Sequence, residues 1–207
     1  FLGTISLVPV SAFIGGIIAV SISYMVARTS QGARLPTLIL AGTAISAFTT
    51  AISSTLLLAS EPDLRPVLSW LLGSFISATW QQGAIVVFYL IPGLLVMLAL
   101  SRVLNILQLG EEQATTLGIN VERNKIWLVG AATLATATAV SFNGLIGFVG
   151  LIAPHVVRLI WGNDYRFLLP MAALVGAAFL VAADLVARTI FSPGELPVGI
   201  ITALCGT

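Results

Sequence analysis

The chain has 207 residues, of which 58% are hydrophobic and 8% charged, with a formal net charge of +1 and a mean hydropathy of +1.07. Soluble domains carry about a quarter charged residues, so too few polar groups are present to cover the surface of a soluble protein. The apolar runs are long and do not alternate with period two, which predicts an all-α, polytopic transmembrane helical bundle. The near-neutral charge gives no indication of nucleic-acid binding.

Charge-free intervals predict the first membrane spans, because a helix needs about 20 residues to cross a hydrocarbon core about 30 Å thick. The first runs from Phe1 to Ala27 and the second from Leu35 to Ser60. The next interval is too long for one span and is interrupted by the polar stretch SATWQQ. We expect Pro66 to Ile76 to dip into the membrane without crossing it, followed by a span from about Gly83 to Leu100 that Pro92 kinks.

The second half of the chain continues this pattern, and the Asn143-Gly144 pair is its natural break. The expected spans are Ile126 to Phe142, about Leu145 to Ile160, Leu168 to Val186, and a last one from about Leu196 that the end of the chain cuts short. The total is about seven spans. Because the chain begins and ends inside apolar runs, we expect a fragment of a longer polypeptide that forms a single transmembrane domain over residues 1–207.

Basic residues orient these spans, since cytoplasmic loops carry an excess of Lys and Arg. If the first span runs from outside to inside, only Arg65 and Arg188 face outward. The seven that then face the cytoplasm are Arg28, Arg34, Arg102, Arg123, Lys125, Arg158 and Arg166. The stretch GEEQATTLGINVERNK, Gly110 to Lys125, is therefore expected to be cytoplasmic.

This stretch holds five of the chain's seventeen charged side chains (9 Lys and Arg, 8 Asp and Glu). Glu111 and Glu112 would lie in the first turn of a short helix, where the helix dipole favours carboxylates, and Gly118 stands at a C-cap position. A modest apolar face is supplied by Leu109, Ala114, Leu117 and Ile119. The pattern indicates a helix that docks on a soluble partner, and a solvated loop is the alternative that the residues leave open.

Glycines are spaced at intervals of three in NGLIGFVGLIAPHVVRL, at Gly144, Gly147 and Gly150. On a helix this spacing would form a small-residue face along which another helix can approach closely. Pro154 would remove one backbone hydrogen bond and kink the same helix near its inner end.

Candidate chemical groups are few. His155 is the only histidine and Cys205 the only cysteine, and neither has companions that would complete a metal site. A structural or interfacial role is favoured for His155. Asp184 precedes Arg188 by one helical turn, which favours an ion pair over a functional carboxylate, although Arg188 could also meet an acidic partner.

Enzyme motifs are missing from the sequence. It contains no GxxxxGKS or GxxxxGKT phosphate loop, no serine nucleophile motif and no HExxH metal motif. The chain is therefore expected to be no enzyme, to hold no metal and to need no cofactor of its own.

Several stretches together resemble the permease subunits of type II ABC importers, the family that moves iron-siderophore complexes, haem and cobalamin. The matching stretches, in the expected order, are WLLGSF (Trp70 to Phe75), LGEEQATTLGINVER (Leu109 to Arg123), GLIGFVGLIAPHVVRLIWGNDYRFLLP (Gly144 to Pro170), ADLVART (Ala183 to Thr189) and ELPVGIITALCG (Glu195 to Gly206). A weaker match is LAGTAISA (Leu40 to Ala47).

The resemblance implies a ten-helix subunit in the bacterial plasma membrane, of which this chain holds roughly the fourth helix to the beginning of the tenth. It also implies the partners: a second permease subunit in a homo- or heterodimer, a pair of ABC ATPase subunits that bind ATP and Mg²⁺, an extracytoplasmic substrate-binding protein, and surrounding lipid. No nucleic acid is expected.

The resemblance also implies roles for particular residues. Within a cytoplasmic coupling loop, 109–125, the residues expected at the ATPase contact are Gly110, Glu111, Glu112, Ala114, Leu117, Gly118 and Ile119. Arg188 and, more loosely, Arg65 match positions that pair with carboxylates of the binding protein. The span from Leu35 to Ser60 corresponds to a helix lining the pathway, with Thr43, Ser46, Thr49, Thr50 and Ser53 as lining candidates. Plain helix packing is the alternative for these small polar residues.

The expected function is import of iron(III)-siderophore complexes, the commonest cargo in the family. A cobalamin or haem importer of the same family is one alternative. A secondary transporter driven by an ion gradient, with Asp184 and His155 as proton sites, is an alternative from a different class.

Overall fold

The computed structural model describes residues 7–31, 35–59, 67, 70–75, 78–190 and 196–206. Every regular element in these residues is an α-helix, which confirms the predicted fold class. Five helices among them are long and apolar enough to cross a membrane, and Val149–Trp161 is a shorter apolar helix. The helices fall into two compact units, residues 1–67 and 68–207.

The first unit is a pair of helices, α1 (Leu7–Gln31) and α2 (Leu35–Ala59), that pack against each other. Ala27 and Ala41 are buried, whereas large apolar side chains such as Phe48 and Leu58 are exposed. Exposed apolar residues at this density need lipid or other helices to cover them. Both helices agree closely with the first two predicted spans.

In the second unit, two long helix pairs carry the packing. Helix α4 (Trp80–Ala99) runs along α7 (Val121–Asn143), and α8 (Val149–Trp161) along α9 (Tyr165–Ile190). A short helix, α10 (Val198–Gly206), contacts both α8 and α9. The polar break predicted at SATWQQ is confirmed, because Thr79 caps α4 and its hydroxyl accepts the backbone N–H of Gln82 at 3.3 Å.

Two predictions about the region after Asn143 are wrong. Helix α8 has 13 residues, about 20 Å of helix, and so is too short for the full span expected from about Leu145 to Ile160. Residues 144–148 are not helical, so Gly144 and Gly147 lie outside the helix and share no packing face with Gly150. Pro154 does lie inside α8.

Other small residues provide the close helix contacts that these glycines were expected to make. A Cβ atom on Gly93 of α4 would lie 2.9 Å from the carbonyl oxygen of Ala131 on α7. A Cβ atom on Gly176 of α9 would lie 3.5 Å from the Cβ of Ala153 on α8. Small residues therefore allow close approach in both helix pairs, as in other membrane helices.

Three glycines bring irregular backbone together in this unit. The N–H of Ser74 donates to the carbonyl of Asn143 at 2.9 Å, and the N–H of Gly199 donates to the carbonyl of Gly73 at 3.3 Å. Gly144 lies against the Trp70 carbonyl with no room for a Cβ atom. Membrane proteins tolerate non-helical backbone when other parts of the protein bury it and satisfy its polar groups. One glycine junction thus joins WLLGSF, the Asn143-Gly144 break and LPVG (Leu196 to Gly199).

Candidate functional site

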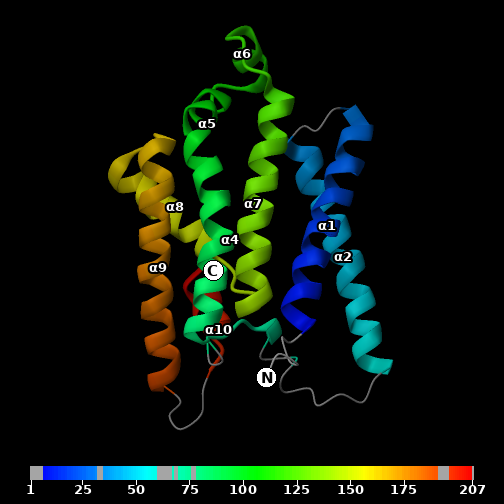
Figure 1. Cartoon of the computed structure of the whole chain (residues 1–207), viewed down its shortest axis with the longest axis vertical. Helices are drawn as coiled ribbons and strands as arrows, with labels where there is room; N and C mark the ends of the chain where they lie inside the picture. Colours follow the sequence, from blue (N-terminus) through cyan, green and yellow to red (C-terminus); the bar gives the residue numbers. More distant parts are fainter. Residues whose placement is uncertain are drawn as a thin grey trace. The chain divides into compact units, whose positions relative to one another are not determined.

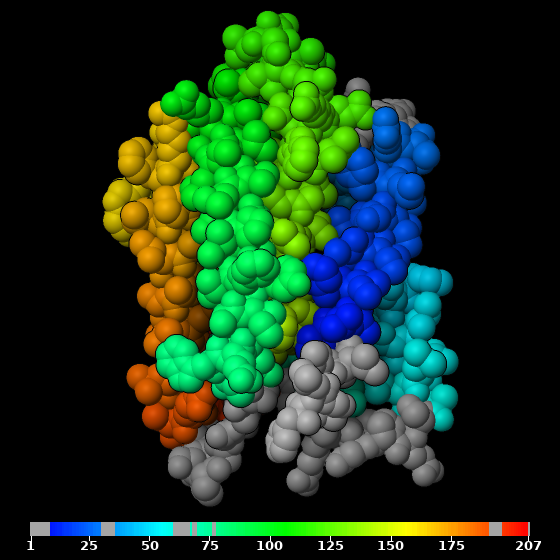
Figure 2. Space-filling view, in the orientation of Figure 1, coloured from blue at the N-terminus to red at the C-terminus, as the bar shows by residue number. Residues whose placement is uncertain are grey.

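Helix α6 (Glu111–Thr116) stands at one end of the second unit, between α5 (Ser101–Leu107) and the start of α7 (Figure 1). In the space-filling view, the α6 region projects beyond the rest of the second unit at that end (Figure 2). Gly118 has φ +79°, its N–H donates to the Thr115 carbonyl, and the next N–H, of Ile119, donates to the Ala114 carbonyl. This pair of bonds is a Schellman cap, so the predicted short helix with a glycine stop is confirmed.

Some residues expected at the ATPase contact also hold α6 in place. Ala114 is fully buried, and Ile119 is half-buried. Glu111 forms an ion pair with Lys125 at the start of α7, at 2.6 Å, and the Lys125 side chain is only 12% exposed. These contacts fix the direction in which α6 points from the end of α7.

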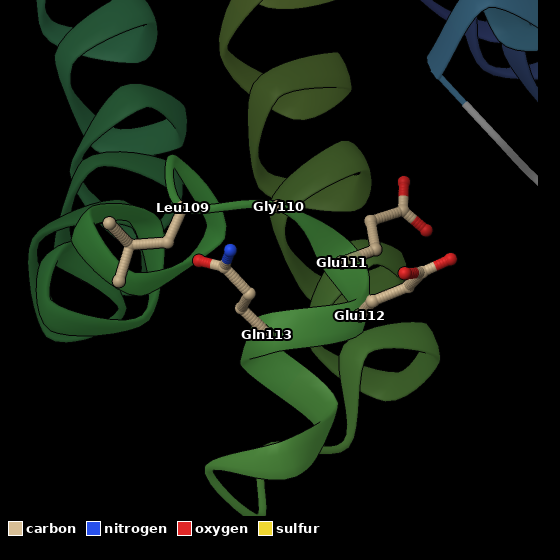
Figure 3. A pocket seen from close by; sticks show the side chains of 5 residues that line it. All are labelled: Leu109, Gly110, Glu111, Glu112 and Gln113. Atoms are coloured by element: carbon tan, nitrogen blue, oxygen red, sulfur yellow. The ribbon is translucent and has the colours of Figure 1, made fainter.

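Other residues of the expected contact face outward. Leu117 is 62% exposed and Leu109 is 59% exposed, at the two ends of α6. An open depression of about 310 Å³ is lined by residues 109–113, and Leu109 is one of its walls. Figure 3 shows the carboxylates of Glu111 and Glu112 extending to the same side, away from Leu109. Two exposed leucines beside a carboxylate and an amide form a small exposed surface, which we call the α6 tip: Leu109, Glu112, Gln113 and Leu117.

A polar network joins the segment before α6 to the turn before α9. Asn105 of α5 donates from Nδ2 to Oδ1 of Asp164 at 2.6 Å and accepts the N–H of Tyr165 at 2.8 Å. Gln108 donates from Nε2 to the carbonyl of Asn163 at 3.1 Å. The bonded residues are up to 60 positions apart in the sequence, so no local pattern indicated this network.

These bonds also set the charge of the network. The N–H of Arg166 and the amide of Asn105 both donate to Asp164, and they hold the pKa of its carboxyl below the ordinary value of 3.8. The carboxylate is therefore ionised at neutral pH, which strengthens the hydrogen bonds that it accepts.

At the other end of α9, the predicted ion pair is confirmed. Nε of Arg188 lies 2.8 Å from Oδ2 of Asp184, and the Arg188 side chain is about half exposed. The ion pair therefore engages the carboxylate that the ion-coupled alternative would use as a proton site. Arg65, the second candidate for binding-protein contact, lies outside the described residues.

The pathway candidates lie along α2, and all of them are exposed: Thr43, Ser46, Thr49, Thr50 and Ser53. The hydroxyls of Thr43, Thr49 and Thr50 donate to carbonyls one turn earlier in their own helix. Such bonds satisfy the hydroxyl donors and leave the oxygens available as acceptors on the helix surface. The role of this row in a pathway stays a prediction.

The remaining candidates make no cluster in the part of the chain that the structure describes. His155 is exposed on α8 and Cys205 is exposed on α10. Within the described residues, no three His, Cys, Asp or Glu side chains come together in a way that could hold a metal ion.

Comparison with known proteins assigns the chain to a family. All of residues 1–207 match the FecCD transport family. The cobalamin import system permease protein BtuC of Halobacterium salinarum is 45% identical over 196 residues, which cover 95% of this chain and 53% of that protein. The hemin transport system permease protein HmuU of Yersinia pestis is 39% identical, with coverage of 95% and 59%.

A third relative and a solved structure agree with these two. The Fe(3+) dicitrate transport system permease protein FecD of Escherichia coli is 39% identical, with coverage of 98% of this chain and 63% of that protein. The chain thus spans between 53% and 63% of the length of these relatives. A structure described as a metal-chelate type ABC transporter in an inward-facing conformation has a TM-score of 0.83 and 30% identity, covering 97% of this chain and 70% of that one. The resemblance is confirmed, and the chain is a multi-pass membrane protein that belongs to the FecCD transport family.

Proposed function

We propose that this chain is part of the permease subunit of an ATP-driven importer, and that the α6 tip is the surface on which a separate ATPase subunit rests. The observation that carries the proposal is the exposure of Leu109 and Leu117 on a helix that is itself braced against α7. Outside the apolar region of the membrane, lipid does not cover such leucines, so a protein partner accounts for them best.

The mechanism follows from how α6 is held. When the ATPase pair closes on ATP and Mg²⁺, it pushes on the α6 tip. The Glu111 to Lys125 ion pair passes this push to α7, which packs along α4. A second permease subunit completes the pathway, and the movement of the rigid spans gives alternating access. The chain itself performs no chemistry and binds no nucleotide.

The other proposed partner is an extracytoplasmic binding protein, which Arg188 meets through charge-assisted hydrogen bonds from its guanidinium. The proposed cargo is an iron(III)-siderophore complex. The names of three relatives specify cobalamin, hemin and Fe(3+) dicitrate. Each of these compounds holds a metal in an organic chelate, as a ferric siderophore does. The cargo is identified by titrating the partner binding protein separately with a ferric siderophore, haem and cobalamin. If the binding protein binds only haem or only cobalamin, the siderophore proposal is wrong.

The docking proposal is tested with Leu117→Glu in the full-length permease. A charge at this position cannot be buried against an apolar ATPase groove, so co-purification of the ATPase should fall at least about tenfold. Leu117→Met, which keeps an apolar side chain of similar volume, is the matched control and should retain the ATPase. Normal ATPase association and uptake with Leu117→Glu would show that the α6 tip is not the docking surface.

A further inference from the structure

The segment that carries α6 is attached to the rest of its unit at two places. One is the Glu111 to Lys125 ion pair on α7. The other is the polar network that joins α5 to the turn before α9, and it ends at Gln108, two residues before Gly110. The docking mechanism uses only the first attachment, so the second needs its own explanation.

The second attachment is a clamp on the first residue of α9. Asn105 uses both ends of its amide, because Nδ2 donates to Asp164 at 2.6 Å while Oδ1 accepts the N–H of Tyr165 at 2.8 Å. Asp164 in turn accepts the N–H of Arg166 at 3.0 Å. A planar amide held on both sides has one permitted orientation, so α5 and the start of α9 must move together.

Helix α9 extends this connection across the unit. It has 26 residues, about 39 Å of continuous helix, and Arg188 lies in its last turn. Figure 1 shows that α9 runs away from the end of the unit where α5 and α6 lie. Its small residues Ala183 and Ala187 pack in the core with Val198 of α10. One helix therefore has its first turn fixed to the α6 segment and its last turn at the position proposed for the binding protein.

We propose that the Asn105 to Asp164 hydrogen bond couples the ATPase face of this permease to its binding-protein face, so that binding at one face changes the activity at the other. The inference rests on the proposed function, namely that α6 docks an ATPase and Arg188 a binding protein. Asn105 and Asp164 are positioning residues in this scheme, since they act through α9 and touch neither partner. Breaking the link leaves each face able to bind and removes the communication between them.

The test uses the full-length permease assembled with its ATPase and binding protein in proteoliposomes. Phosphate release is measured with and without the binding protein for Asp164→Ala and for Asn105→Asp, which sets two carboxylates against each other. Both variants should keep the ATPase and its basal rate, while stimulation by the binding protein falls at least about threefold. Loss of stimulation with an unchanged basal rate and retained ATPase is the readout that separates the link from a general loss of stability.

Asn124→Ala is the matched control, because the Asn124 amide bonds only to the Asn120 carbonyl in its own turn. It should behave as the wild type. Full stimulation with Asp164→Ala would overturn the inference, and so would full stimulation with Asn105→Asp. Loss of ATPase binding by Asp164→Ala would place the network in the docking surface and also overturn it. If the proposed function is wrong, the result is different: Leu117→Glu then keeps normal ATPase association and uptake, whatever the Asn105 and Asp164 variants do.

Discussion

The three glycines of the junction, Gly73, Gly144 and Gly199, leave no room for a side chain. Gly73 and Gly144 have positive φ angles, of 69° and 72°, which L side chains rarely adopt. At all three positions a Cβ atom would overlap a carbonyl from another segment. These glycines therefore serve close backbone approach between segments distant in sequence, and the helix-face role expected for Gly144 is replaced by this one.

Gly144→Ala is expected to destabilise the protein by about 2 kcal/mol or more, because the added methyl group combines a strained φ with a backbone overlap. Gly130→Ala is the matched control: Gly130 lies within α7 and a Cβ atom there meets nothing within 4 Å. That control should change stability by no more than about 1 kcal/mol. Thermal unfolding of both variants in detergent makes the comparison, and equal unfolding temperatures would contradict the tight junction.

Arg188 gives a second prediction at this scale. Arg188→Glu places a carboxylate beside Asp184 and should weaken capture of the binding protein at least about tenfold, since it removes a charge-assisted contact and adds a like charge. Asp184→Asn is the control, because it abolishes the internal ion pair and keeps the Arg188 charge. Affinity for the binding protein is measured in nanodiscs. If both variants weaken capture equally, the internal pair rather than Arg188 itself is what the binding protein requires.

At the scale of elements, the sequence predicted helices whose signals are local. Helix α6 could be predicted because its first-turn carboxylates and Gly118 are contained in eight residues, and α2 because its interval is apolar and free of charge. Helix α8 could not, since its start depends on distant contacts. Phe148, directly before it, has φ +65°, and its ring occupies the space where a Cβ of Gly206 would lie. Apolar periodicity alone does not show such packing.

The link between α5 and α9 was missed for the same reason. Asn105 and Asp164 are single polar residues in separate segments, and their 59-residue separation hides the contact. The GNDYR segment has no helix, turn or metal pattern that would predict a bond to Asn105. The α6 tip shows the converse case, because the sequence predicted the short helix but could not tell which side chains face outward and which, like Ala114, are buried.

The pH dependence of stability tests the α5 to α9 link directly. Since the pKa of Asp164 is lowered in the folded protein, its contribution is fully present above 3.8 and is lost as the pH falls through the lower folded value. The difference in unfolding temperature between wild type and Asp164→Ala should therefore stay constant from neutral pH to about pH 5 and narrow below about pH 4. A difference that grows on acidification would show that the carboxyl gains no ionised-state hydrogen bonds on folding.

At the scale of the whole molecule, the charge distribution and the long helices agree on a topology. Helix α7 has 23 residues and α9 has 26, so each is long enough to reach from one side of a hydrocarbon core about 30 Å thick to the other. Arg123 and Lys125 lie in the first turns of α7, and Arg166 lies in the first turn of α9. Both helices thus begin on the side where basic residues gather, which the positive-inside rule predicts to be the cytoplasmic side.

This topology predicts opposite labelling of the two proposed docking faces. In a background with Cys205→Ser, which removes an exposed thiol, Gln113→Cys reports on the α6 tip and Thr189→Cys on the far end of α9. A membrane-impermeant maleimide added to intact spheroplasts should label position 189 and should reach position 113 only after permeabilisation. Because α9 is about 39 Å long and continuous, both positions cannot lie on one side while its first turn stays beside α5. Labelling of position 113 from outside would reverse the orientation and place the α6 tip beyond the reach of any cytoplasmic ATPase.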